Sequence, residues 1–190
     1  MTKAHDAIII DSILQSEKTL LAGIECARVY TQVVEELIQR RPSMLTEYCK
    51  NQDFPELKWR HSDAVFNSQD PGPLIGDSDM LQERNIGILA EGTTGFRDIS
   101  LGIYWLNKNI RLEWGKLLYE KLNTQLGRSA DCRKDSSWLW RIKHAEWRNW
   151  TTPEALLSLH RKELTKPEEI CLDIYRAVKE FFAEHPQVVE

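Results

Sequence analysis

The chain has 190 residues and a formal net charge of −4, with 42% hydrophobic and 28% charged residues. These are ordinary globular proportions, so they exclude collagen-like, low-complexity and intrinsically disordered classes. The length suffices for a sizeable core, and we interpret residues 1–190 as a single domain.

The N-terminal apolar run is too short to be a targeting or membrane segment. Asp11 and Glu17 interrupt it, whereas a membrane span needs about 20 apolar residues in succession. We therefore expect a cytoplasmic protein with no membrane contact. The cysteines show no C-x-x-C pair and the histidines no metal-binding spacing, so the sequence predicts no metal site and no cofactor.

Apolar residues recur at helical spacing in the first forty residues. The pattern predicts one helix over residues 4–21, a break at Gly23 and a second helix over residues 24–40. Arg41 suits the negative end of the helix dipole, and Pro42 should stop the helix.

The next part of the chain is rich in turn residues. PELKWRHS predicts a short strand, which we extend over residues 57–66. Proline, glycine, serine and aspartate are frequent in the residues that follow, so we predict a mobile loop over residues 67–84.

The clearest strand signal covers residues 85–107. Two β-rich arms flank the turn Gly92-Thr93-Thr94-Gly95 and predict a hairpin. In the second arm, one face should be apolar and cover helices, and the other should be mixed. The apolar face carries Ile99, Leu101, Ile103 and Trp105.

Helical signals dominate the C-terminal half. An amphipathic helix is predicted over residues 111–126, with Leu117 among its inward residues and Gly127 as its C-cap. Thr152-Pro153 predicts a second helix start. Thr165 and Glu168 have the spacing of a capping box, which should open the last helix.

Together these elements predict an α+β fold. A small, mainly antiparallel sheet would contain the hairpin at 85–107 and strands at 57–66 and 137–147. The sheet would pack against an N-terminal helical hairpin at 4–41 and the C-terminal helices. A helical hairpin of this kind can also mediate homodimerisation.

The segment Ser136–Trp150 contains four of the seven tryptophans, interleaved with cations. From Arg128 to Trp150 there are six basic and three acidic residues, a balance of +3, so the rest of the chain carries −7. Read as a strand, the segment places Trp138, Trp140 and Ile142 on one face and Leu139, Arg141 and Lys143 on the other.

Two interpretations of this segment stay open. In the first, the tryptophans belong to the core and the cations lie on the solvent face. In the second, the cations and outer tryptophans bind an acidic protein surface, since Trp and Arg favour such contacts, or bind single-stranded nucleic acid. The partner-binding candidates are Arg141, Lys143, Trp147, Arg148 and Trp150.

The order of these features carries a resemblance. A strand LGIYWLNKN, a long helix, SSWLWRIKHAEWRNW, a TPE helix start and a closing helix resemble the C-terminal part of a PD-(D/E)XK nuclease-like family. The resemblance covers about Gly87 to Phe182 and rests on aromatic spacing.

The resemblance implies an Asp on one strand and an acid-x-Lys on the next, which together hold Mg²⁺. Only Glu56-Leu57-Lys58 has the second form in a strand-like context, and no Asp-bearing strand precedes it. If the chain is an active nuclease of this kind, Glu56 and Lys58 are the catalytic candidates and Mg²⁺ is the cofactor. The missing Asp-bearing strand instead favours a degenerate, shortened relative that lacks the active centre.

The sequence contains no complete catalytic motif: there is no nucleophile elbow, phosphate loop or dinucleotide fingerprint. Our leading interpretation is therefore a non-catalytic binding protein. A phage or mobile-element inhibitor that occupies a surface of a host protein fits this description, and a metal-dependent or degenerate nuclease is the alternative.

Overall fold

The computed structural model describes residues 3–52, 54–60, 74–93, 97–107, 113–127, 137–143, 152–161 and 163–186. The chain divides into two compact units, Met1–Ile38 and Gln39–Glu190, and each is described by itself. None of the helices in the described ranges is long and apolar enough to cross a membrane.

The N-terminal helices are α1 (Lys3–Leu14) and α2 (Glu17–Lys50). The chain breaks at Ser16, whose hydroxyl accepts the Thr19 N–H at 3.2 Å in the manner of an N-cap. The predicted break at Gly23 is wrong, because Gly23 lies inside α2. A Cβ there would lie 2.8 Å from Ile13 Cγ2, so glycine allows α1 to approach α2 closely.

The predicted stop at Pro42 is also wrong, since α2 continues to Lys50. Proline inside a helix costs about 3 kcal/mol because it removes one hydrogen bond and clashes with the preceding turn. Within the Gln39–Glu190 unit, however, Arg41, Leu45 and Cys49 are buried at four-residue spacing on one side of the helix. Tertiary packing of this side offsets the cost of Pro42.

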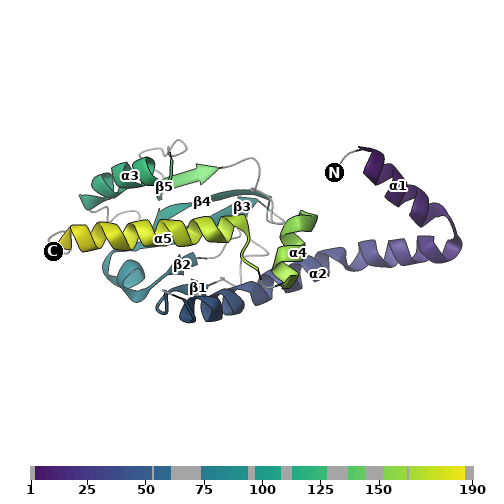
Figure 1. The fold of residues 1–190 in the computed structure, drawn as a ribbon, viewed down its shortest axis with the longest axis horizontal. Coiled ribbons are helices and arrows are strands. Elements are labelled where there is room, and N and C mark those ends of the chain that lie inside the picture. The colour runs from purple at the N-terminus through teal and green to yellow at the C-terminus, as the bar shows by residue number, and fades with distance from the viewer. Residues whose placement is uncertain are drawn as a thin grey trace. The chain divides into compact units, whose positions relative to one another are not determined.

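A five-stranded antiparallel sheet forms the centre of the second unit (Figure 1). The strands follow the chain order β1 (Lys58–Arg60), β2 (Leu74–Gly76), β3 (Ile86–Thr93), β4 (Arg97–Trp105) and β5 (Trp138–Lys143). The predicted α+β class, the antiparallel sheet and the hairpin of β3 and β4 are confirmed.

The predicted loop over residues 67–84 is wrong in its second half. Residues 74–76 form β2, and a short π-helix η1 (Asp79–Glu83) follows. Gly76 lies within that predicted loop but is a strand residue. It makes room for Leu81, whose Cγ would lie 3.0 Å from an added Cβ. The expected strand at 61–66 and the loop at 67–73 lie outside the described residues.

Three further helices are described in this unit: α3 (Trp114–Gln125), α4 (Pro153–Arg161) and α5 (Lys166–Glu184). In Figure 1, α5 lies across β3 and β4, and it contacts both strands as well as α3. Trp114 of α3 packs against Trp105 of β4 and Phe182 of α5, with ring centroids 5.3 and 4.9 Å apart. This aromatic contact joins the two helices to the sheet.

The local helix signals are largely confirmed. Thr165 and Glu168 form the predicted capping box of α5, and Gly127 follows α3 with a left-handed φ of 105°. The Thr152 hydroxyl accepts the N–H of Ala155 at the start of α4. The prediction that Leu117 points inward is wrong, since this side chain is 48% exposed.

Candidate functional site

The register of the sheet separates a core face from a second face. One row of paired residues crosses all five strands, and every member is at most 4% exposed. This core row consists of Trp59, Ile75, Ile88, Ile103 and Trp140. Since side chains alternate along a strand, the residues next to the core row point to the opposite face.

A β-bulge in β5 moves Trp138 to that opposite face. Trp140 pairs with Ile103, but Trp138 pairs with Tyr104, so the register shifts and Leu139 is the extra residue. The predicted shared face for Trp138 and Trp140 is therefore wrong. An irregularity of this kind has no local sequence signal, because alternation alone places both rings on one side.

The five described tryptophans are all buried, between 0% and 7% exposed. The Trp140 indole N–H donates to Asn123 of α3 at 3.1 Å, and that of Trp59 lies 3.4 Å from the Cys49 sulfur. The core interpretation is confirmed for Trp138 and Trp140.

On the second face of the sheet, Trp138 contacts two other side chains, Tyr104 and Arg141. The Tyr104 and Trp138 rings meet edge to face with centroids 5.5 Å apart, and the Arg141 guanidinium lies 5.8 Å from the centre of the Trp138 ring. Tyr104 and Arg141 are half-buried, and Lys143 is exposed at the end of β5. We call Tyr104, Trp138, Arg141 and Lys143 the sheet-face cluster.

Only part of the predicted partner-binding set can be placed. Arg141 and Lys143 lie two residues apart on β5, opposite Gly102 and Ser100 of β4. Trp147, Arg148 and Trp150 lie outside the described residues. The alternation along β5 is thus confirmed for the two cations, which both point away from the core row.

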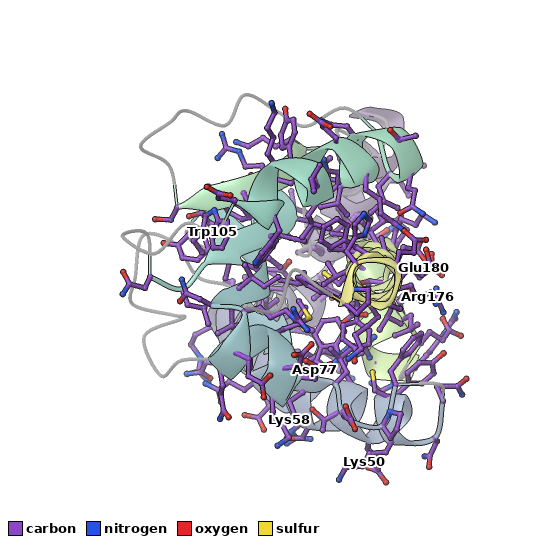
Figure 2. All side chains as sticks on the ribbon, turned by 90° about the vertical axis from the view of Figure 1, so that its left-hand side faces the viewer. Lys50, Lys58, Asp77, Trp105, Arg176 and Glu180 are labelled. Carbon is purple, nitrogen blue, oxygen red and sulfur yellow. The ribbon has the colours of Figure 1, made fainter. Side chains whose placement is uncertain are left out.

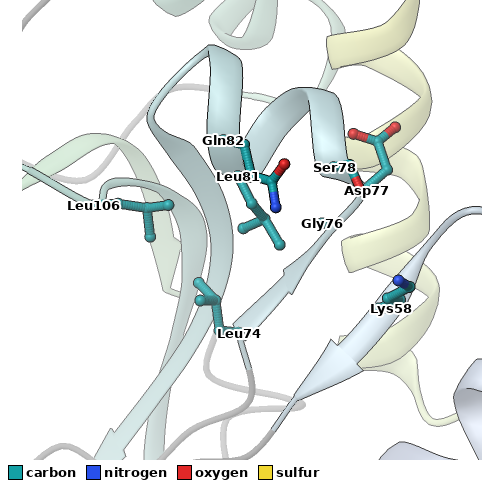
Figure 3. A pocket seen from close by; sticks show the side chains of 8 residues that line it. All are labelled: Lys58, Leu74, Gly76, Asp77, Ser78, Leu81, Gln82 and Leu106. Carbon is teal, nitrogen blue, oxygen red and sulfur yellow. The ribbon is translucent and has the colours of Figure 1, made fainter.

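The catalytic candidates of the nuclease alternative lie at β1. Glu56 and Lys58 are exposed, and Leu57 between them is fully buried. Lys58 pairs with Gly76 of β2 and lines a pocket of about 200 Å³ together with Asp77 and Leu81 (Figure 3). Sequence reasoning did not select Asp77, because it lies among residues that read as a loop.

The Asp77 carboxylate is turned toward α5 (Figure 3). One oxygen accepts the Met80 N–H at 2.9 Å. The other accepts the Tyr175 hydroxyl at 2.7 Å and the Lys179 ammonium at 3.0 Å, and Asp77 itself is 1% exposed. Asp77 therefore connects β2 and η1 to α5. Figure 2 labels it near α5, which is seen there nearly end-on.

These contacts also set the protonation of the pair. Burial by itself raises the pKa of the Asp77 carboxyl, but the three hydrogen-bond donors outweigh it and hold that pKa below its ordinary value. Burial, together with the hydrogen bond to Asp77, raises the pKa of Tyr175. The carboxylate therefore stays charged and the Tyr175 hydroxyl stays a donor at neutral pH.

This arrangement does not fit a Mg²⁺ site. Both Asp77 oxygens already accept hydrogen bonds, and Lys179 supplies a local positive charge. Across the described ranges, no three His, Cys, Asp or Glu side chains are grouped so that they could hold a metal ion. We derive no metal-dependent step from these residues.

A second surface belongs to the N-terminal unit. Among the residues that the structure describes, nine of the thirteen exposed large hydrophobic side chains lie between residues 8 and 33. They are Ile8, Ile9, Ile10, Leu14, Leu20, Leu21, Ile24, Tyr30 and Val33. Such a concentration of exposed apolar side chains is typical of a binding surface.

No family model, no curated protein and no solved structure matches this chain.

Proposed function

We propose that this protein is a non-catalytic macromolecular binding protein that occupies a surface of a protein partner through its sheet-face cluster. The observation that carries the proposal is the contact of Trp138 with Tyr104 and with Arg141 on the face of the sheet opposite the core row. Tyr, Trp and Arg are the residue types that dominate binding hot spots.

The contacts within the cluster favour binding because they restrict its side chains before a partner arrives. Trp138 is 7% exposed, so it serves as a fixed base for the Arg141 guanidinium. An arginine held in this way loses less conformational entropy on binding. Lys143 adds an exposed positive charge two residues further along β5.

Charge and burial favour an acidic protein surface over nucleic acid. The whole chain carries −4, which opposes long-range attraction of a polyanion, and tight DNA binding typically uses about 6–10 phosphate contacts. The Trp138 ring, at 7% exposure, is also too buried for a base to stack on it. A small cationic cluster on an acidic body suits competition for one acidic patch of a protein, as an inhibitor of a host factor would require.

Site-specific photo-crosslinking in cells tests this proposal. A benzophenone amino acid replaces Lys143 and, as the matched control, Lys116, which is an exposed lysine on α3. We expect a discrete protein adduct from position 143 only. Adding Arg141→Glu should reduce that adduct at least about tenfold, and adding Lys116→Glu should not.

The proposal would be overturned if the crosslinker gave the same adducts at positions 143 and 116. It would also be overturned if Arg141→Glu left the adduct from position 143 unchanged. An adduct that disappears on nuclease treatment would show that the partner is nucleic acid and not a protein.

A further inference from the structure

The pocket beside Lys58 lies on the second face of the sheet. Lys58 pairs with Gly76, and each adjoins a member of the core row, so alternation places both residues on the opposite face. Pockets for drug-sized ligands typically measure about 300–1,000 Å³. With a volume of about 200 Å³, this pocket suits a smaller molecule.

Two glycines of the second face leave room for an apolar wall. A Cβ at Gly76 would lie 3.0 Å from Leu81 Cδ2, and one at Gly87 would lie 2.6 Å from Leu74 Cδ1. Any larger residue would therefore displace these leucines. Leu74 and Leu81 line the pocket together with Leu106 (Figure 3), so the pocket offers three apolar side chains to a ligand.

The backbone around this wall has two uncommon conformations. The adjoining η1 is a π-helix, a form that is rare and frequently found at functional sites. Asn85, two residues after η1, has a left-handed φ of 57°. Its carbonyl accepts the Leu106 N–H at 3.0 Å, and its side-chain amide forms two hydrogen bonds with the backbone of Asn107. Conformations that surrounding contacts hold in this way cluster at ligand sites, and here they fix the position of Leu106.

The charge of the pocket comes from Lys58. Its side chain is exposed, so its ammonium group can approach a ligand. The Asp77 carboxylate also borders the pocket, but it is turned toward α5, where the Lys179 ammonium compensates its charge at 3.0 Å. The other polar side chains among the described lining residues, Ser78 and Gln82, are neutral. One cation beside an apolar wall therefore defines the chemistry of the pocket.

We propose that this pocket binds a small carboxylate with a short apolar body. The carboxylate would accept hydrogen bonds from the Lys58 ammonium, and the apolar body would cover the three leucines. A carboxylate brings one negative charge to one lysine, whereas a phosphate group brings about two and has no apolar part. Complementarity of charge and polarity thus favours an apolar acid.

This pocket is separate from the sheet-face cluster and does not depend on the function proposed for it. Lys58 lies on β1 and Arg141 on β5, the two outer strands of the sheet. Four strand spacings of about 4.8 Å separate them, roughly 19 Å in all. A small ligand at Lys58 therefore cannot reach the cluster.

NMR titration of the full chain with 4-methylpentanoate tests the pocket. This acid has the branched body of a leucine side chain and one carboxylate. We expect chemical-shift changes at residues 74–82 and a dissociation constant of about 1 mM, as is usual for a ligand of this size. The neutral analogue 4-methylpentanamide and the smaller acid acetate should each bind at least about fivefold more weakly.

Two variants with matched controls assign the binding to this pocket. Lys58→Met removes the ammonium group but keeps a long side chain, and it should weaken binding at least about fivefold. Lys116→Met, at an exposed lysine of α3, should not. Gln82→Phe should fill the pocket from an exposed position and abolish binding, whereas Glu83→Phe, at the exposed neighbour that does not line the pocket, should leave it intact. Equal far-UV circular dichroism should verify that all four variants stay folded.

The proposal would be overturned if about 20 mM acid gave no shifts at residues 74–82. Equal affinities for the acid and its amide, or equal effects of Lys58→Met and Lys116→Met, would also overturn it.

A titration with acetyl-glycyl-leucine identifies the source of the carboxylate. This peptide ends in the same branched side chain and a carboxylate. Tighter binding than that of 4-methylpentanoate would support the pocket and assign its ligand to the C-terminal residue of a protein. Weaker binding would support a free small acid.

Discussion

Arg41 of α2 and Glu168 of α5, 127 positions apart in the chain, form a buried bidentate ion pair. The Arg41 Nε donates to one carboxylate oxygen at 2.7 Å and Nη2 to the other at 2.6 Å. The residues are 4% and 0% exposed. Glu168 also accepts the Thr165 N–H at 2.7 Å, so one carboxylate both caps α5 and connects it to α2.

Replacing Arg41 should be far more costly than replacing a surface arginine. In Arg41→Met, Glu168 keeps its burial but loses its charge partner, and we expect a loss of about 3–5 kcal/mol in the free energy of unfolding. Urea denaturation would measure it.

The double variant Arg41→Met, Glu168→Gln should recover part of the loss, because glutamine is neutral and can still accept the Thr165 N–H. A loss below about 1 kcal/mol in the single variant would mean that water reaches the carboxylate. The exposed pair of Arg28 and Glu25 provides the control, since Arg28→Met should cost no more than about 0.5 kcal/mol.

Asp77 should make the protein sensitive to acid. Its pKa is lower in the folded protein than the ordinary value of 3.8, so its stabilising effect is complete above about pH 4 and disappears as the pH falls through the folded pKa. Asp77→Asn should lower stability at neutral pH by about 2 kcal/mol and flatten the pH dependence between about pH 4 and 2.

Thermal unfolding at a series of pH values would measure this effect. Asp173 is the control, because it forms an exposed ion pair with Arg176 on α5, and Asp173→Asn should leave the acid slope nearly unchanged. An unchanged slope in Asp77→Asn would assign the acid sensitivity to other carboxylates.

Local signals predicted those parts of the fold that local interactions determine. The β3–β4 hairpin follows from alternation and a tight turn, and the start of α5 follows from the capping box of Thr165 and Glu168. The partner of Glu168 could not be predicted in this way. The sequence indicates only that Arg41 is a cation near the end of a helix. The continuation of α2 beyond Pro42 depends on tertiary packing.

The candidate site shows the same division. The alternation along β5 correctly placed Arg141 and Lys143 away from the core row. It misplaced Trp138, because the bulge at Leu139 depends on how β5 pairs with β4. Asp77 was missed because β2 is only three residues long and lies among glycines and prolines, where no periodicity can develop.

The nuclease alternative can be tested by a separate biochemical measurement. Because the Asp77 oxygens are engaged by Tyr175 and Lys179, we expect the purified protein to show no Mg²⁺- or Mn²⁺-dependent cleavage of plasmid or single-stranded DNA. Metal-dependent cleavage that disappears in both Glu56→Ala and Lys58→Ala would contradict this expectation. Cleavage that persists in both variants would indicate a contaminant.

Gly102 should be the least replaceable glycine in the sheet. A Cβ at this position would lie 2.1 Å from the Trp140 carbonyl oxygen and 2.6 Å from the Arg141 Cα. Both atoms are backbone of β5, so no rotamer change can relieve the clash, and β4 and β5 would have to separate. We expect Gly102→Ala to cost about 3 kcal/mol or more in unfolding free energy.

Gly23→Ala provides the matched comparison. Its Cβ would also meet an atom at 2.8 Å, but that atom is Ile13 Cγ2 at the end of a flexible side chain, and alanine favours a helix over glycine by about 1 kcal/mol. The net change should therefore stay within about 1 kcal/mol of zero. Equal losses in the two variants would show that the close pairing of β4 with β5 is not what requires Gly102. Arg141 lies on β5 opposite Gly102. If Gly102→Ala lowers the unfolding free energy strongly and Gly23→Ala does not, Gly102→Ala should also weaken the photo-crosslink from position 143.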